Sequence, residues 1–130
     1  MKAIILNSIL FLFCLSLSAQ NNIDKVLNKL ETQTSFYGDI SNTIWNYAEM
    51  GYQEEKSSAL LQKTLKDEGF KITAGVAGMP TAFIAEFGSG SPVIAILGEY
   101  DALPGLSQQA IPEKKSAGNK AGHACGHHLF

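Results

Sequence analysis

The chain has 130 residues, of which 45% are hydrophobic and 17% charged, a balance typical of one small globular domain. Its formal net charge is −2, and it contains ten lysines and no arginine. This composition excludes the strongly basic face with which proteins bind nucleic acids, and we expect no nucleic-acid partner.

A signal peptide is predicted over residues 1–19. Lys2 precedes an apolar run that ends in small residues around Ala19, as at a secretory cleavage site. The apolar run of about 15 residues is shorter than the roughly 20 that span a bilayer, so we expect no stable membrane anchor. The mature chain, residues 20–130, is therefore expected to be exported to the periplasm or the cell exterior.

Apolar residues at helical spacing predict a helix over residues 21–47. They are Ile23, Val26, Leu27, Leu30, Phe36, Ile40, Ile44 and Tyr47. Gly38 either interrupts this helix or merely weakens it, and Gly51 is expected to stop it. A second helix is predicted from near Glu54 to Gly69, where glycine provides a natural end.

Three β-strands are then predicted, at residues 70–73, 81–87 and 92–97. Residues 88–91 are expected to join the last two strands as a hairpin. The last strand is apolar on both sides of its pleat, which is typical of an interior strand in an α/β fold. Residues 105–122 show no periodicity and are predicted to form a functional loop.

Polar residues follow the predicted interior strand directly. Glu99 and Asp101 occupy the position where open α/β sheets usually build their sites. Asp101 is suited to support a metal-bound imidazole or to bind the metal itself. The alternatives are a turn or helix-capping role for Asp101 before Pro104, and a solvated strand end for Glu99.

A cluster of metal-binding side chains lies close to the last residue. It contains His123, Cys125, His127 and His128. Thiolate and imidazole are ligands that zinc and neighbouring ions prefer, and the glycines in this run let the backbone bend. The alternatives are incidental surface residues, a partial structural zinc site, or a thiol nucleophile at Cys125. Since signal cleavage would leave Cys125 as the one cysteine, no internal disulfide would compete with metal binding.

Four segments together carry a resemblance to a known family. They are residues 45–54, 75–83, 98–109 and 122–127. In this order they resemble the amidohydrolase branch of the aminoacylase/carboxypeptidase metallopeptidase family, nearest to the group of aminobenzoyl-glutamate hydrolase subunits.

The resemblance implies an α/β catalytic domain with a dinuclear metal centre, in which a mixed sheet packs with helices. Residues 20–130 would be the truncated N-terminal part of that domain, and the lid domain, through which relatives form homodimers, would not be in this chain. It further implies that Cys125 and His127 bind two divalent ions, Zn or Mn, and that Asp101 supports the centre. The general base would lie beyond Phe130.

The roles of three residues stay open under this resemblance. Glu99 stands where other branches place a histidine ligand, and His128 stands where relatives commonly have asparagine or aspartate. His123 is not assigned a role.

The function that the resemblance implies is metal-dependent amide hydrolysis. The expected substrates are N-acyl amino acids, aminobenzoyl-glutamate or dipeptides, with the present chain incomplete for catalysis. The alternative is a non-catalytic exported binding module, whose Cys/His cluster holds a structural zinc or is vacant.

Overall fold

The computed structural model describes residues 22–129. The predicted signal peptide, residues 1–19, lies outside the described residues. The chain divides into two units, Met1–Gly38 and Asp39–Phe130. Within the described part, no helix has the length and apolar character needed to cross a membrane.

The predicted first helix is confirmed, with a break at a different residue. Residues 22–32 are helical, a turn follows at Gln33, and α2 spans Thr34–Tyr47. The break falls there because the Thr34 hydroxyl and the Gln33 N–H both donate to the Leu30 carbonyl, which competes with the regular helical pattern. Gly38 lies inside α2 and does not interrupt it.

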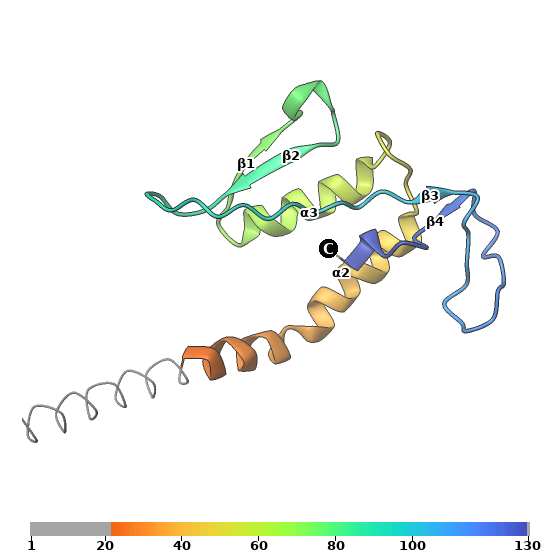
Figure 1. The fold of residues 1–130 in the computed structure, drawn as a ribbon, viewed down its shortest axis with the longest axis horizontal. Coiled ribbons are helices and arrows are strands. Elements are labelled where there is room, and N and C mark those ends of the chain that lie inside the picture. Colours follow the sequence, from red (N-terminus) through yellow and green to blue (C-terminus); the bar gives the residue numbers. More distant parts are fainter. Residues whose placement is uncertain (1–21, 130) are drawn as a thin grey trace, which may run out of the picture. The chain divides into compact units, whose positions relative to one another are not determined.

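A carboxylate organises the turn that follows α2. The helix ends at Tyr47, four residues before Gly51, and α3 spans Glu55–Asp67 as predicted (Figure 1). Glu49 accepts hydrogen bonds from the backbone N–H groups of Lys56 (3.0 Å) and Ser57 (2.8 Å). Its side chain therefore caps the start of α3, where backbone donors lack helical partners.

Two of the predicted strands are confirmed. β1 spans Lys71–Ala74 and β2 spans Phe83–Glu86. They pair antiparallel, with Lys71 opposite Glu86 and Ala74 opposite Phe83, and α3 packs against both (Figure 1). The short 3-10 helix η1, Val76–Gly78, lies between them in the chain.

The predicted interior strand at residues 92–97 and the hairpin at 88–91 are wrong for the chain as described. Residues 93–100 have no assigned secondary structure. Val93, Ile94, Ile96 and Leu97 are 84–94% exposed. No other strand of the described part lies beside this run, so its backbone groups have no ladder to join.

A second, very small sheet was not predicted. β3, Leu103–Pro104, pairs antiparallel with β4, Ala121–Gly122. The predicted loop lies between them and is held by side chains, since the Ser107 hydroxyl accepts the N–H groups of Ala117 and Asn119, both at 3.1 Å. A final 3-10 helix, η2, spans His127–Leu129.

Gly122 allows two backbone segments to approach each other. A Cβ atom at this position would lie 2.2 Å from the carbonyl oxygen of Leu106. Gly126 has a φ of 87°, which side chains rarely adopt. Both positions thus have the backbone freedom expected of glycine, while the convergence of Cys125 and His127 on one ion stays a prediction.

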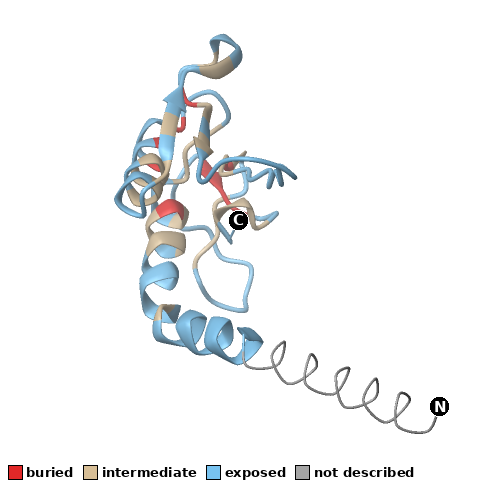
Figure 2. Cartoon of the chain, turned by 90° about the vertical axis from the view of Figure 1, so that its left-hand side faces the viewer, coloured by how far each residue is buried: buried red, intermediate tan, exposed pale blue. Residues whose placement is uncertain are grey.

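The apolar core of the second unit is small. Ile44, Ala102 and Ala121 are 2–3% exposed, and the buried residues are red in Figure 2. The described residues thus form helices with small antiparallel sheets, which fits part of an α/β fold. The larger mixed sheet of a dinuclear-metal catalytic domain stays a prediction.

Candidate metal site

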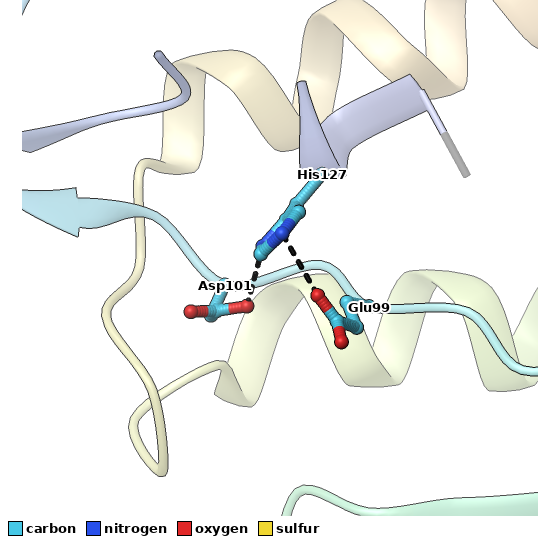
Figure 3. A group of neighbouring side chains, drawn as sticks. All are labelled: Glu99, Asp101 and His127. Atoms are coloured by element: carbon cyan, nitrogen blue, oxygen red, sulfur yellow. Dashed lines mark hydrogen bonds and ion pairs between the residues drawn. The ribbon is translucent and has the colours of Figure 1, made fainter. Parts of the chain in front are cut away.

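The residues flanking Tyr100 and the first residue of η2 form the candidate site. Side chains of an extended chain alternate between its two faces, so Glu99 and Asp101 point to the same side. The backbone reversal at Gly126 brings His127 opposite them (Figure 3). Segments separated by 26 residues therefore meet at one imidazole ring.

The two carboxylates contact opposite nitrogens of His127. Asp101 Oδ1 lies 2.7 Å from His127 Nδ1, and Glu99 Oε2 lies 2.8 Å from His127 Nε2 (Figure 3). The side chains of His127, Asp101 and Glu99 are 19%, 32% and 57% exposed. The site is thus open to solvent on the side of Glu99.

The donor set suits a divalent metal ion. One potential ligand atom from each of the three residues lies within 4.8 Å of the others. Imidazole nitrogen and carboxylate oxygen are both accepted by Zn²⁺, and carboxylates also suit Mn²⁺. A ring nitrogen that carries a proton donates it to the carboxylate that it faces, and a ring nitrogen without a proton can bind an ion. His127 can therefore either link the two carboxylates or act as a metal ligand.

Cys125 does not join this group. Among residues 22–129 it is a free and exposed thiol, and the cluster around His127 does not include it. The prediction that Cys125 and His127 are metal ligands stays a prediction. The structure brings His127 together with Asp101, the expected supporting residue, and with Glu99, whose role the sequence left open.

His123 and His128 lie beside Trp45. His123 is 3% exposed, and its Nε2 lies 3.2 Å from the Ile44 carbonyl near the end of α2. The Trp45 ring lies 6.3 Å from the His123 ring and 4.8 Å from the His128 ring, centroid to centroid. These contacts attach the histidine segment to α2.

The two histidines share an unusual environment. Burial lowers the pKa of His123, with the nearby His127 acting in the same direction and the Ile44 hydrogen bond opposing it. Burial also lowers the pKa of His128, and the neighbouring His123 adds to this effect. Each ring has a buried Nδ1 with no hydrogen-bond partner among the described residues. Both rings therefore favour the neutral form, which can accept a proton or an ion.

Sequence reasoning missed the polar network behind the site. The Thr81 hydroxyl donates to the Glu54 carboxylate (2.7 Å), while the Thr81 carbonyl accepts from the hydroxyls of Ser58 (2.6 Å) and Tyr100. All four residues are buried or half-buried. Three of them stand in the segments that carry the family resemblance, which was the available signal.

A separate shallow hollow of about 300 Å³ lies between the end of α2 and β4. Residues 46–50 and 119–121 contribute to its lining, and Glu99, Asp101 and His127 do not. The hollow is therefore distinct from the candidate metal site, and the donor chemistry of the cluster identifies the site better than the shape of the surface does.

Comparison with known proteins gives a consistent set of relatives. No protein-family profile matches the chain. It is 47% identical over 104 residues to a subunit of the p-aminobenzoyl-glutamate hydrolase of Escherichia coli (strain K12), a match that covers 78% of this chain and 21% of the relative. It is also 31% and 30% identical over 107 residues to thermostable carboxypeptidases 1 and 2 of Saccharolobus solfataricus, covering 81% of this chain and 27% of each relative.

The chain matches only part of each relative, and these relatives are similar in kind. The chain spans about a fifth to a quarter of the length of these curated relatives. The relatives agree with one another in kind, since each is named as a hydrolase or a peptidase. The chain belongs to the amidohydrolase/peptidase family of these proteins.

Proposed function

We propose that the full-length protein is a metal-dependent amide hydrolase. The observation that carries the proposal is the group formed by Glu99, Asp101 and His127, whose potential ligand atoms lie within 4.8 Å of one another. A histidine between two carboxylates on the surface of a hydrolase-family chain is a suitable place for a divalent ion.

Each residue of the group has a distinct task in this proposal. Asp101 accepts the Nδ1 proton of His127 and thereby fixes the orientation of the ring. This leaves Nε2, on the side of Glu99, to face an ion. Cys125 is proposed as a further ligand, together with His127. The site is proposed to hold two divalent ions, either Zn²⁺ or Mn²⁺. When bound, such ions supply Lewis-acid chemistry toward an amide carbonyl and the attacking water.

The proposed substrates are aminobenzoyl-glutamate, N-acyl amino acids and short dipeptides. The support is the set of names found among the relatives, a p-aminobenzoyl-glutamate hydrolase and two carboxypeptidases. The chemistry common to these names is an amide bond to an amino acid that carries a free carboxylate. The names favour catalysis over a non-catalytic binding module with a structural zinc.

Chelation tests the metal dependence. The full-length protein is treated with a chelator, and release of p-aminobenzoate from aminobenzoyl-glutamate is measured before and after return of Zn²⁺ or Mn²⁺. We expect the activity to disappear with the chelator and to return with the metal. Activity that survives complete metal removal would contradict the proposal and favour Cys125 as a thiol nucleophile.

Two substitutions test the assignment of residues. Asp101→Asn should weaken metal binding about 10- to 100-fold, because it removes the charged partner that orients His127. Asp67→Asn is the matched control, since Asp67 is exposed and pairs with Lys63 on the surface of α3. Cys125→Ser should lower both metal content and rate, and full metal occupancy in this variant would rule out Cys125 as a ligand.

We also propose that the protein is exported and acts outside the cytoplasm, on the basis of Lys2 and the apolar run after it. N-terminal sequencing of the mature protein should begin at Gln20, and a chain recovered with Met1 from the cytoplasm would contradict export.

Association with another chain is a further proposal, because one relative is named as a subunit. The molar mass of the full-length protein in solution tests this association: a mass above that of one chain supports it, and the mass of a single chain contradicts it.

A further inference from the structure

Tyr100 stands between the two carboxylates of the candidate site but faces away from it. In an extended segment its side chain points to the side opposite Glu99 and Asp101. There its hydroxyl donates a hydrogen bond to the Thr81 carbonyl. We infer that Tyr100 is a positioning residue, which holds the backbone of residues 99–101 so that both carboxylates face His127. The inference rests on the proposed metal site and deepens it.

The acceptor of this hydrogen bond is itself firmly held. Thr81 is 8% exposed, and its carbonyl also accepts the Ser58 hydroxyl at 2.6 Å. Its own hydroxyl donates to Glu54, which is also 8% exposed, at 2.7 Å. Because buried polar groups are costly to leave unpaired, this network resists displacement of any one member. Tyr100 thus binds to a carbonyl that Ser58 of α3 also binds and that lies two residues before β2 in the chain.

The next residues reinforce the anchor. The Phe83 ring lies 6.2 Å from the Tyr100 ring, centroid to centroid. Ala102 is 2% exposed, and its N–H donates to the Glu49 carbonyl at 2.7 Å. Hydrogen bonds on both sides of Asp101 therefore hold this stretch of backbone in place.

The carboxylates themselves have little other support. The contacts that the structure describes for the side chains of Glu99 and Asp101 are those with His127. Glu99 is 57% exposed and Asp101 32%. Their direction therefore depends on the backbone, and the backbone is fixed by residues 100 and 102 on its opposite side.

Tyr100→Phe in the full-length protein tests the inference, because it keeps the ring and removes the hydroxyl. Tyr52→Phe is the matched control, since Tyr52 is 75% exposed. We expect Tyr100→Phe to weaken Zn²⁺ or Mn²⁺ binding about tenfold, measured by calorimetric titration, the lower end of the effect of partners behind metal ligands. Tyr52→Phe should leave the affinity unchanged.

Two further measurements separate positioning from stability and from the metal proposal. Ile44→Val, a mild change in the core, shows how far loss of stability alone lowers metal affinity. The second measurement needs no metal. In protein labelled with ¹⁵N-histidine, the ring N–H signals of His127 report its hydrogen bonds to the carboxylates, and Tyr100→Phe should broaden or shift them.

The metal affinity and the His127 signals of Tyr100→Phe together either support or overturn the inference. Weaker metal binding in Tyr100→Phe, beyond the effect of Ile44→Val, supports the inference, and an affinity equal to that of the unchanged protein overturns it. If the unchanged protein binds no metal, the proposed function fails, and the His127 signals decide the inference alone. Unaltered signals in Tyr100→Phe would then overturn it, and altered signals would support it.

Discussion

Two adjoining parts of one extended segment differ completely in their surroundings. In residues 93–97 the four large apolar side chains are 84–94% exposed. In residues 98–102, Glu99 and Asp101 contact His127, Tyr100 binds Thr81, and Ala102 is buried against the turn after α2. The backbone is extended in both parts, so local conformation does not explain the difference.

Burial in this segment of the described residues follows specific contacts rather than the hydrophobicity of the side chains. The first part has the more apolar sequence, yet no strand or helix of the described residues covers it. The second part is polar and is fixed by hydrogen bonds on both of its faces. An apolar run of this kind stabilises a structure only when another surface removes it from water.

Of the changes at Gly122, Glu49 and Ile96, the largest effect is expected at Gly122, which lies in β4 opposite Leu103 of β3. Gly122→Ala should lower the free energy of unfolding by about 3 kcal/mol, because the new Cβ would meet the Leu106 carbonyl at 2.2 Å. Denaturant unfolding measures this. Gly38→Ala is the control, since nothing lies within 4 Å of that position, and it should be neutral or slightly stabilising. Equal stability of the two variants would show that the backbones of Gly122 and Leu106 do not approach as described.

An intermediate effect is expected at Glu49, whose carbonyl binds Ala102 and whose carboxylate caps α3. Glu49→Gln should destabilise the protein by about 1 kcal/mol at neutral pH. Burial would raise the pKa of Glu49, but hydrogen bonds from Lys56 and Ser57 outweigh it, so the pKa lies below its ordinary value of 4.5.

The pH dependence of this effect has a definite sign. A lowered pKa in the folded state stabilises the protein above the ordinary carboxyl pKa, and this stabilisation is lost as the pH falls through the folded value. The difference between Glu49→Gln and the unchanged protein should therefore shrink in acid. Glu113→Gln, in the exposed loop, is the control for loss of a surface charge at neutral pH. A difference at Glu49 that grows in acid would disprove the capping role.

The smallest effect is expected in the apolar run itself. Ile96→Thr should change the free energy of unfolding by less than about 0.5 kcal/mol, because Ile96 is 94% exposed. The same substitution at Ile44, which is 2% exposed, should cost about 2 to 4 kcal/mol. If the two substitutions destabilise the full-length protein equally, another surface covers Ile96 there, and the contrast between the two parts no longer holds.

Much of the fold could be predicted from periodicity and turn residues. The helices, β1, β2 and the long loop follow from short-range patterns that are complete within each segment. The strand at 92–97 was wrong because its pattern states which residues avoid water and not which partner covers them. β3 and β4 were missed since two-residue strands leave no periodicity to detect.

The site shows the same division. Residue chemistry pointed to Asp101, Cys125 and His127; the structure brings Asp101 and His127 together, and Cys125 stays outside their group. Glu99 joins them because side chains alternate along an extended chain, so Glu99 and Asp101 lie on the same side. The sequence alone did not show whether Glu99 belongs to the site or is a solvated strand end. The contributions of Trp45 and Thr81 depend on contacts between distant segments, so periodicity and spacing did not reveal them, and their place in the segments of family resemblance was the available signal.

The position of His127 between two acids has a consequence for how these three side chains are held. Two carboxylates so close together repel each other, and the imidazole ring lies between them and contacts one with each of its nitrogens. The three side chains therefore hold one another in place through contacts of their own. At the proposed metal site, an ion binding to His127 would meet ligands that already face one another.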